Sequence, residues 1–156
     1  MTKISLAVVL VALAIGMAGT ASAGVNDPEV IIYRFPGVKD DGGGNGVGVG
    51  TSFHCTNFSG ATENIRFATR ASLGGLATNM AFSISHLQTL TASTHGINAY
   101  STFSLATGPI FQGTTAIAAT SINIICTAET IDASTTVPIG VARRGIRFNP
   151  VPGSQE

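Results

Sequence analysis

A two-residue alternation of side chains around the first cysteine constrains the fold more than any other feature. From Val47 to Cys55 the odd-numbered residues are valine, threonine, phenylalanine and cysteine, and glycine, serine or histidine lies between them. Successive side chains of a β-strand point to opposite faces of the sheet, so this pattern predicts a strand with one buried face. Its early glycines leave the exposed face nearly bare.

The same alternation recurs along the chain, and no segment shows a helical repeat with caps. Thr and Val, which are frequent here, favour strands over helices. We therefore expect an all-β fold, an antiparallel sandwich of about seven to nine short strands. The further strands are expected at Val30–Phe35 (ending at Pro36), Ile65–Arg70, Asn79–Ser83 with Ile84, around Leu90, and at Ala116–Thr120, Ile122–Ile131 and Val141–Phe148.

The first 23 residues have the pattern of a secretory signal peptide: Lys3, an uncharged apolar run over 4–19, and Ala21-Ser22-Ala23 as a cleavage site. A membrane anchor needs about 20 apolar residues, and this run is shorter and contains glycine. We expect cleavage after Ala23 and export to the periplasm or the extracellular space. The mature chain, 24–156, is predicted to be one β-sandwich domain without a membrane span, with a flexible, proline-containing tail near 149–156.

The two cysteines, Cys55 and Cys126, predict one disulfide, because an even count in an exported chain favours pairing. The bridge would close a loop of about 70 residues and contribute roughly 4 kcal/mol of stability in the chain-entropy model. Two buried free thiols are the alternative. Each cysteine lies mid-strand on an apolar face, one early and one late, so the disulfide is expected to be an inter-sheet bridge.

In Cys55, Cys126 and the strand count, the mature chain resembles immunoglobulin-like extracellular domains. It differs in having no Trp and in carrying Ile124 two residues before the second cysteine, where those domains have a tyrosine. More loosely, the run Cys55–Gly60 before an Arg-bearing strand resembles small exported bacterial sandwich proteins of unassigned activity. The resemblance implies an architecture and no function.

Composition excludes several function classes. Charged residues make up 10% of the chain, and 8 Lys and Arg balance 8 Asp and Glu. A nucleic-acid-binding protein needs a cationic surplus to neutralise phosphates, so no nucleic-acid partner is expected. A charge-rich disordered chain and a long charged helix are excluded by the same counts. With no Trp and 2 Tyr, the aromatic residues are mostly the 8 Phe, which we expect inside the fold.

The loop at Asp40 and Asp41 is a weak candidate for calcium. Carboxylates beside glycines offer hard oxygen ligands, and the stretch 43–49 approaches the repeat of calcium-binding β-rolls. However, Gly48 stands where the repeat has its liganding aspartate, and there is one copy. A glycine turn between the first two strands is the favoured interpretation.

The chain has three histidines, His54, His86 and His95. A zinc or copper site, or a hydrolytic site, would need two of them, or one with an acid and a serine, to converge. No Gly-x-Ser-x-Gly motif is present. We predict no catalytic residue, no metal and no cofactor, and expect structural or exposed histidines.

Arg143, Arg144 and Arg147 form a basic cluster near the end of the chain, which is a candidate site for an anionic polymer or a lipid headgroup. The favoured alternative is that these arginines solvate a strand face and block edge pairing.

Two function hypotheses remain. The favoured one is a non-catalytic secreted or cell-surface β-sandwich with a binding or structural role, whose partner is an extracellular protein, a polysaccharide or a second copy of itself. The alternative is a small secreted enzyme or metal-binding protein that uses His54, His86 or His95. The scarcity of charged and catalytic residue types favours the first.

Overall fold

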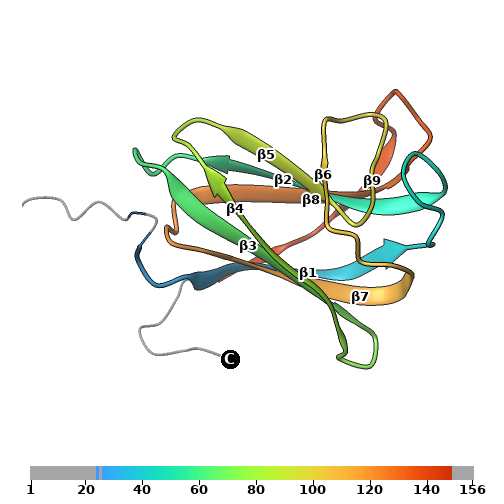
Figure 1. Cartoon of the computed structure of the whole chain (residues 1–156), viewed down its shortest axis with the longest axis horizontal. Helices are drawn as coiled ribbons and strands as arrows, with labels where there is room; N and C mark the ends of the chain where they lie inside the picture. The colour runs from blue at the N-terminus through green and yellow to red at the C-terminus, as the bar shows by residue number, and fades with distance from the viewer. Residues whose placement is uncertain (1–23, 25, 149–156) are drawn as a thin grey trace, which may run out of the picture.

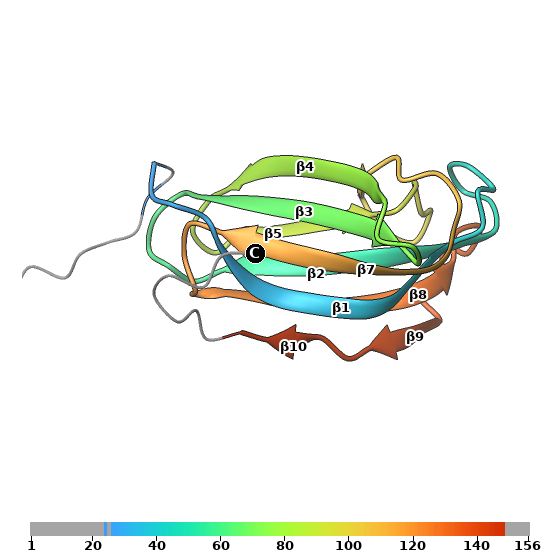
Figure 2. The same ribbon diagram turned by 90° about the horizontal axis from the view of Figure 1, so that it is seen from below.

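The computed structural model describes residues 24 and 26–148. The predicted signal peptide and the predicted tail at 149–156 lie outside the described residues. The described part contains strands and no helix, and the predicted all-β sandwich is confirmed: two five-stranded sheets pack face to face (Figures 1 and 2). No helix that could span a membrane occurs in this part of the chain.

Sheet A has the strand order β10-β1-β7-β3-β4, and sheet B has the order β6-β5-β2-β8-β9. Neighbouring strands are antiparallel except β5 and β6, which are parallel. The strands are β1 (Val30–Asp40), β2 (Val49–Asn57), β3 (Glu63–Ala71), β4 (Leu76–Ile84), β5 (Thr89–Ser93), β6 (Phe103–Ser104), β7 (Ile110–Ala119), β8 (Ile124–Asp132), β9 (Gly140–Arg143) and β10 (Ile146–Arg147).

The expectation that the first strand ends at Pro36 is wrong, because β1 continues through Pro36 to Asp40. The pairing of β1 with β7 shifts register between Pro36 and Val38. Such irregularities are where a sheet tolerates proline, which has no N–H to donate to the neighbouring strand. The strand therefore carries Asp40, expected in a loop, to the buried end of the sheet.

The single strand expected at Val141–Phe148 is two strands in two different sheets. β9 pairs with β8 in sheet B, and β10 pairs with β1 in sheet A, so the chain crosses from one sheet to the other along one edge of the sandwich (Figure 2). At the crossing, a Cβ on Gly145 would overlap the ring of Phe35. The absence of a side chain at Gly145 lets the backbone cross directly over the core.

Aromatic rings form a continuous chain through the core. Phe35, Phe53 and Phe67 are fully buried, and adjacent ring centroids lie 5.7 and 5.9 Å apart. Phe82 follows Phe67 at 6.0 Å, and Phe103 follows Phe82 at 5.1 Å. The last members are increasingly exposed, so the aromatic core reaches the surface beside β4.

The predicted disulfide between Cys55 and Cys126 is confirmed, but its expected position between the sheets is wrong. Cys55 of β2 faces Cys126 of β8 in the same sheet, with Cα atoms 4.2 Å apart. Facing residues of antiparallel neighbours can lie about 4.5 Å apart, whereas stacked sheets are about 10 Å apart. The bridge therefore fastens two strands that are 71 residues apart in sequence and adjacent in space.

Candidate functional site

His95 and Asp40 form a buried pair at one end of the sandwich. His95 Nδ1 lies 2.8 Å from Asp40 Oδ2, and both side chains are nearly inaccessible. The other carboxylate oxygen of Asp40 accepts the N–H of Gly42 at 2.7 Å, and the hydroxyl of Thr107 donates to Oδ2 at 3.3 Å. The pair thus joins the end of β1 to the loop that follows it and to the segment 94–109 that follows β5.

An open cavity of about 390 Å³ borders this pair, between the loops of residues 41–48 and 94–109. Its lining includes Asn45, Thr94, Ser104 and Pro109 together with the pair itself. His95 Nε2 is buried without a hydrogen-bond partner and packs against Gly50, where a Cβ would lie 3.3 Å from it. Neither ring nitrogen is therefore presented to a molecule in the cavity.

Asp41 has a different role from Asp40. Its carboxylate accepts the N–H groups of Val49 at 2.7 Å and Gly43 at 3.0 Å, and these two hydrogen bonds lower the pKa of Asp41. Within residues 24 and 26–148, no three His, Cys, Asp or Glu side chains form a group that could hold a metal ion. The two adjacent carboxylates fasten the loop to different neighbours, and the calcium site stays a prediction.

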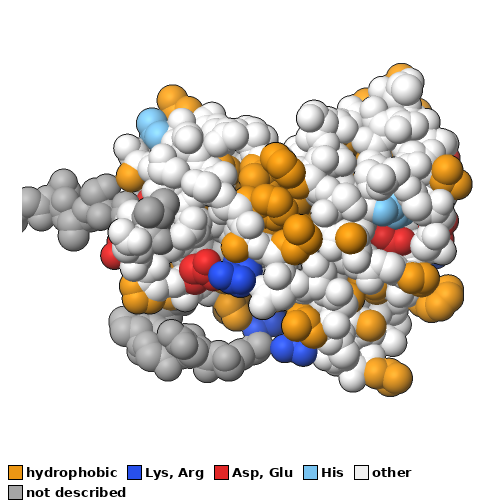
Figure 3. All heavy atoms as spheres, viewed as in Figure 1, with side chains coloured by type: hydrophobic (Ala, Val, Ile, Leu, Met, Phe, Trp, Pro, Cys, Tyr) orange, Lys and Arg blue, Asp and Glu red, His pale blue; other side chains and the backbone are white. Residues whose placement is uncertain are grey.

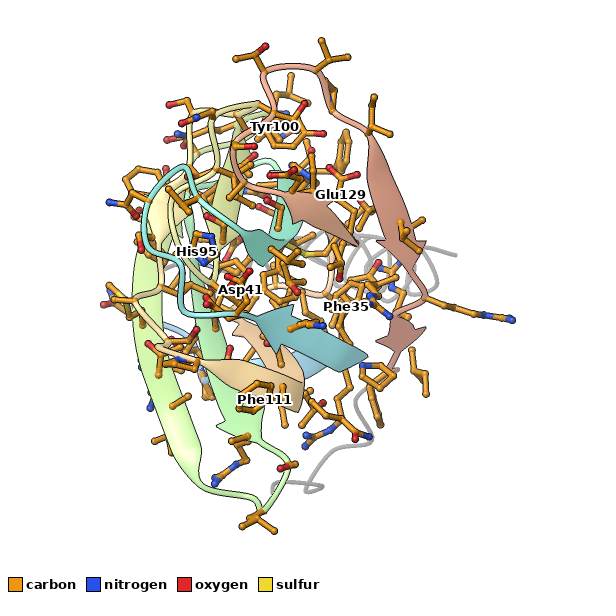
Figure 4. All side chains as sticks on the ribbon, turned by 90° about the vertical axis from the view of Figure 1, so that its right-hand side faces the viewer. Phe35, Asp41, His95, Tyr100, Phe111 and Glu129 are labelled. Carbon is orange, nitrogen blue, oxygen red and sulfur yellow. A yellow bond between two sulfur atoms is a disulfide. The ribbon has the colours of Figure 1, made fainter. Side chains whose placement is uncertain are left out.

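A second polar cluster lies on the outer face of sheet B (Figure 4). The hydroxyl of Tyr100 donates to Glu129 Oε1 at 2.6 Å, and His54 Nε2 lies 3.5 Å from the same oxygen. The rings of His54 and Tyr100 meet edge to face, with centroids 4.6 Å apart. Burial and the Glu129 carboxylate raise the pKa of Tyr100 to about 12, so the phenol stays neutral and donates the bond.

This cluster contains the residue types of a hydrolytic site without its geometry. Ser52 faces Glu129 across the β2–β8 ladder, but its buried hydroxyl bonds to no base. His54 Nδ1 bonds to Thr91 Oγ1 at 3.0 Å instead. No local sequence pattern indicates that Tyr100 and Glu129 meet, because this contact depends on the packing of a loop against β8.

The third histidine lies at the opposite end of β2 from His95. His86 is exposed, and its Nδ1 accepts the N–H of Gly60 at 3.0 Å. The three histidines therefore occupy three separate places, as the interpretation of structural or exposed histidines requires.

The three C-terminal arginines diverge. Arg143 donates to Thr130 Oγ1 at 2.7 Å, and Arg147 donates to the carbonyl of Ile122 at 2.7 Å and lies over the ring of Tyr33. Arg144 is exposed. Two of the three guanidinium groups thus donate hydrogen bonds to different parts of the protein, one to β8 and one to the residues just before β8.

An exposed apolar surface lies where the row of aromatic core rings reaches the surface. Met80 and Phe82 of β4 and Phe103 of β6 form this surface, which we name the β4 seam. Met80 is 37% exposed and Phe103 is 53% exposed. Figure 3 shows hydrophobic side chains gathered in a hollow over the region where β4 and β6 approach each other in Figure 1. The expectation that the phenylalanines lie inside is wrong here, and sequence alternation could not show that sheet B leaves this part of β4 uncovered.

No known protein family, no curated protein and no solved structure matches this chain.

Proposed function

We propose that the protein is an exported, non-catalytic β-sandwich that acts by binding, and that the β4 seam is the surface that contacts its partner. The observation that carries the proposal is the combination of an apolar patch with a long strand edge that has no neighbouring strand among residues 24 and 26–148. β4 has nine residues, whereas the other edge strands in the described part, β6, β9 and β10, have two to four.

The sequence of β4 supports this role. Exposed strand edges are usually protected from pairing by charged residues, proline or a very short length. The segment LATNMAFSI has no charge and no proline. An extended segment of a partner can therefore add to this edge and cover Met80 and Phe103 with its own side chains.

The polar clusters favour binding over catalysis. Both ring nitrogens of His95 face protein groups, and Ser52 bonds to no base near His54. The disulfide fits an oxidising compartment, which agrees with the predicted signal peptide. The alternative hypothesis, a histidine-dependent enzyme or metal-binding protein, rests on the cavity beside the Asp40–His95 pair, to which neither ring nitrogen of His95 is presented.

The binding role is tested by immobilising the mature chain and measuring retention of exported proteins, of polysaccharides and of the chain itself. We expect one of these ligands to bind, and its affinity to fall at least about tenfold in Phe103→Ser, because removing the ring deletes buried apolar area worth more than about 1.4 kcal/mol. Phe111→Ser is the matched control, since Phe111 is 84% exposed and lies outside the seam (Figure 4). Equal binding by both variants, or no binding to any ligand, would contradict the proposal.

A further inference from the structure

We propose that the partner at the β4 seam is a second copy of this chain, and that the two β4 strands pair antiparallel across a twofold axis to join the two A sheets into one continuous sheet. This pairing rests on the binding role proposed above. It commits that role to a single partner and to the register in which Ala81 of one copy faces Ala81 of the other.

The two faces of β4 differ in character. Thr78, Met80, Phe82 and Ile84 lie opposite the buried residues Thr69, Phe67, Ile65 and Glu63 of β3, so they point to the core side of sheet A. Ala77, Asn79, Ala81 and Ser83 alternate with them and point outward. A strand added to the free edge has to keep its apolar row on the core side, because a slip of one residue would expose it.

A twofold axis at Ala81 satisfies this condition for both copies. Facing residues of an antiparallel pair point to the same side, so Met80 of one copy faces Phe82 of the other on the core side. This pair gains a favourable contact between sulfur and an aromatic ring. On the outer side, Asn79 faces Ser83, and two small alanines meet at the axis. Next to the axis, apolar side chains thus meet on the core side and polar ones on the outer side, and one step farther out Thr78 faces Ile84.

Charge permits this contact between identical molecules. No charged residue lies in β4, and the whole chain has a formal net charge of zero. The cation nearest the axis along the sheet is Arg66 of β3, which faces Ala81. Its guanidinium is paired with the Glu29 carboxylate at 2.5 Å, so the two copies do not bring unpaired positive charges together.

The register is tested by cysteine substitution. In the proposed pairing, the two Ala81 positions face each other, and facing Cα atoms lie within the range that a disulfide requires. Ala81→Cys is expected to form a covalent dimer under mild oxidation. Ala77→Cys, on the same outward face, is expected to stay monomeric because its counterpart lies eight residues along the partner strand. A dimer in Ala77→Cys, or none in Ala81→Cys, would overturn the pairing.

Association itself is measured on the mature chain by sedimentation equilibrium up to high protein concentration. The expected species is a dimer, and Met80→Lys is expected to weaken it at least about tenfold by placing an unpaired cation in the contact. Circular dichroism is used to check that this variant is folded, and Phe111→Ser should dimerise as the natural chain does. A monomer at every concentration would overturn the self-pairing. If such a monomer still binds a foreign protein through Phe103, the binding role stands; if it binds nothing, both fail.

Discussion

At the scale of residues, the loop after β1 shows how one carboxylate, that of Asp41, determines which residue type fits at a neighbouring position. Asp41 accepts two backbone N–H groups, and its side chain fills the space beside Gly48, where a Cβ would overlap the carboxylate. Gly48 also has a φ of 76°, which a residue with a side chain rarely adopts. The residue that breaks the resemblance to a calcium-binding repeat is therefore required by the packing of the loop.

Gly48→Ala and Gly44→Ala separate these two effects. Gly44 also has a positive φ, of 85°, but a Cβ there would meet nothing within 4 Å. We expect Gly44→Ala to lower the free energy of unfolding by about 1 kcal/mol from backbone strain alone. Gly48→Ala should lower the free energy of unfolding by more than Gly44→Ala does, because the Asp41 contacts are also lost. Urea unfolding measures both, and equal losses would show that the contact with Asp41 contributes nothing.

Tyr100 should titrate at unusually high pH. Burial and Glu129 raise its pKa from 10.0 to about 12. Because the folded pKa lies above the ordinary one, the stability linked to this proton is present below pH 10 and is lost as the pH rises from 10 toward 12. Tyrosinate absorbance after a rapid pH jump should show this late ionisation in the natural chain and lack it in Tyr100→Phe.

Glu129→Gln provides the control for that titration. Removing the carboxylate charge should move the pKa of Tyr100 back toward its ordinary value. An unchanged absorbance curve in Tyr100→Phe would mean that the late-titrating group is another residue.

At the scale of elements, side-chain alternation predicted the central strands, because each of them buries one face. β2 and β3 agree with the expected segments within a few residues. The alternation could not predict which strands become neighbours. The position of the disulfide, the division of the last segment into β9 and β10, and the two-residue strand β6 all depend on strand order.

The contacts of the candidate sites also depend on which strands are neighbours. Asp40 and His95 are each candidate residues in the sequence, but they are 55 positions apart, so no local pattern indicates that they meet. Tyr100 reaches Glu129 from a loop, and Phe103 reaches Phe82 from the opposite sheet. Such contacts are fixed by the packing of the sheets and leave no local pattern in the chain.

The disulfide should act mainly on the unfolded chain. It closes a loop across 71 residues, for which the chain-entropy model gives about 4 kcal/mol. Replacing both Cys55 and Cys126 with alanine should lower the free energy of unfolding by about that amount, with β2 and β8 still paired by their backbone ladder. Chemical denaturation with and without a reducing agent measures the effect. Reduction should destabilise the natural chain and leave the double variant unchanged, and a double variant as stable as the oxidised chain would contradict the expectation.

At the scale of the whole molecule, neutrality and low charge should determine how association responds to salt. The proposed contact has no ion pair, so screening has no attraction to weaken. We expect the dissociation constant of the dimer to stay constant as the sodium chloride concentration rises. In rising concentrations of sulfate it should fall, because salts that are excluded from the protein surface strengthen apolar contacts. Light scattering over a salt series measures this. Dissociation at high salt would indicate a contact built on charges instead.

The crossing of the chain from β9 to β10 has a consequence for biosynthesis. Ribosomes deliver the amino-terminal part first, yet β1 needs β7 and β10 as neighbours, and β2 needs β8. A nascent chain that has reached β6 therefore holds few of its final neighbours, and most of its pairings form only after the distant strands emerge. Folding dominated by such long-range pairing is slow. The polypeptide therefore gains most of its strand pairings, and the cysteine that completes its covalent bridge, only after β7 and β8 have been synthesised.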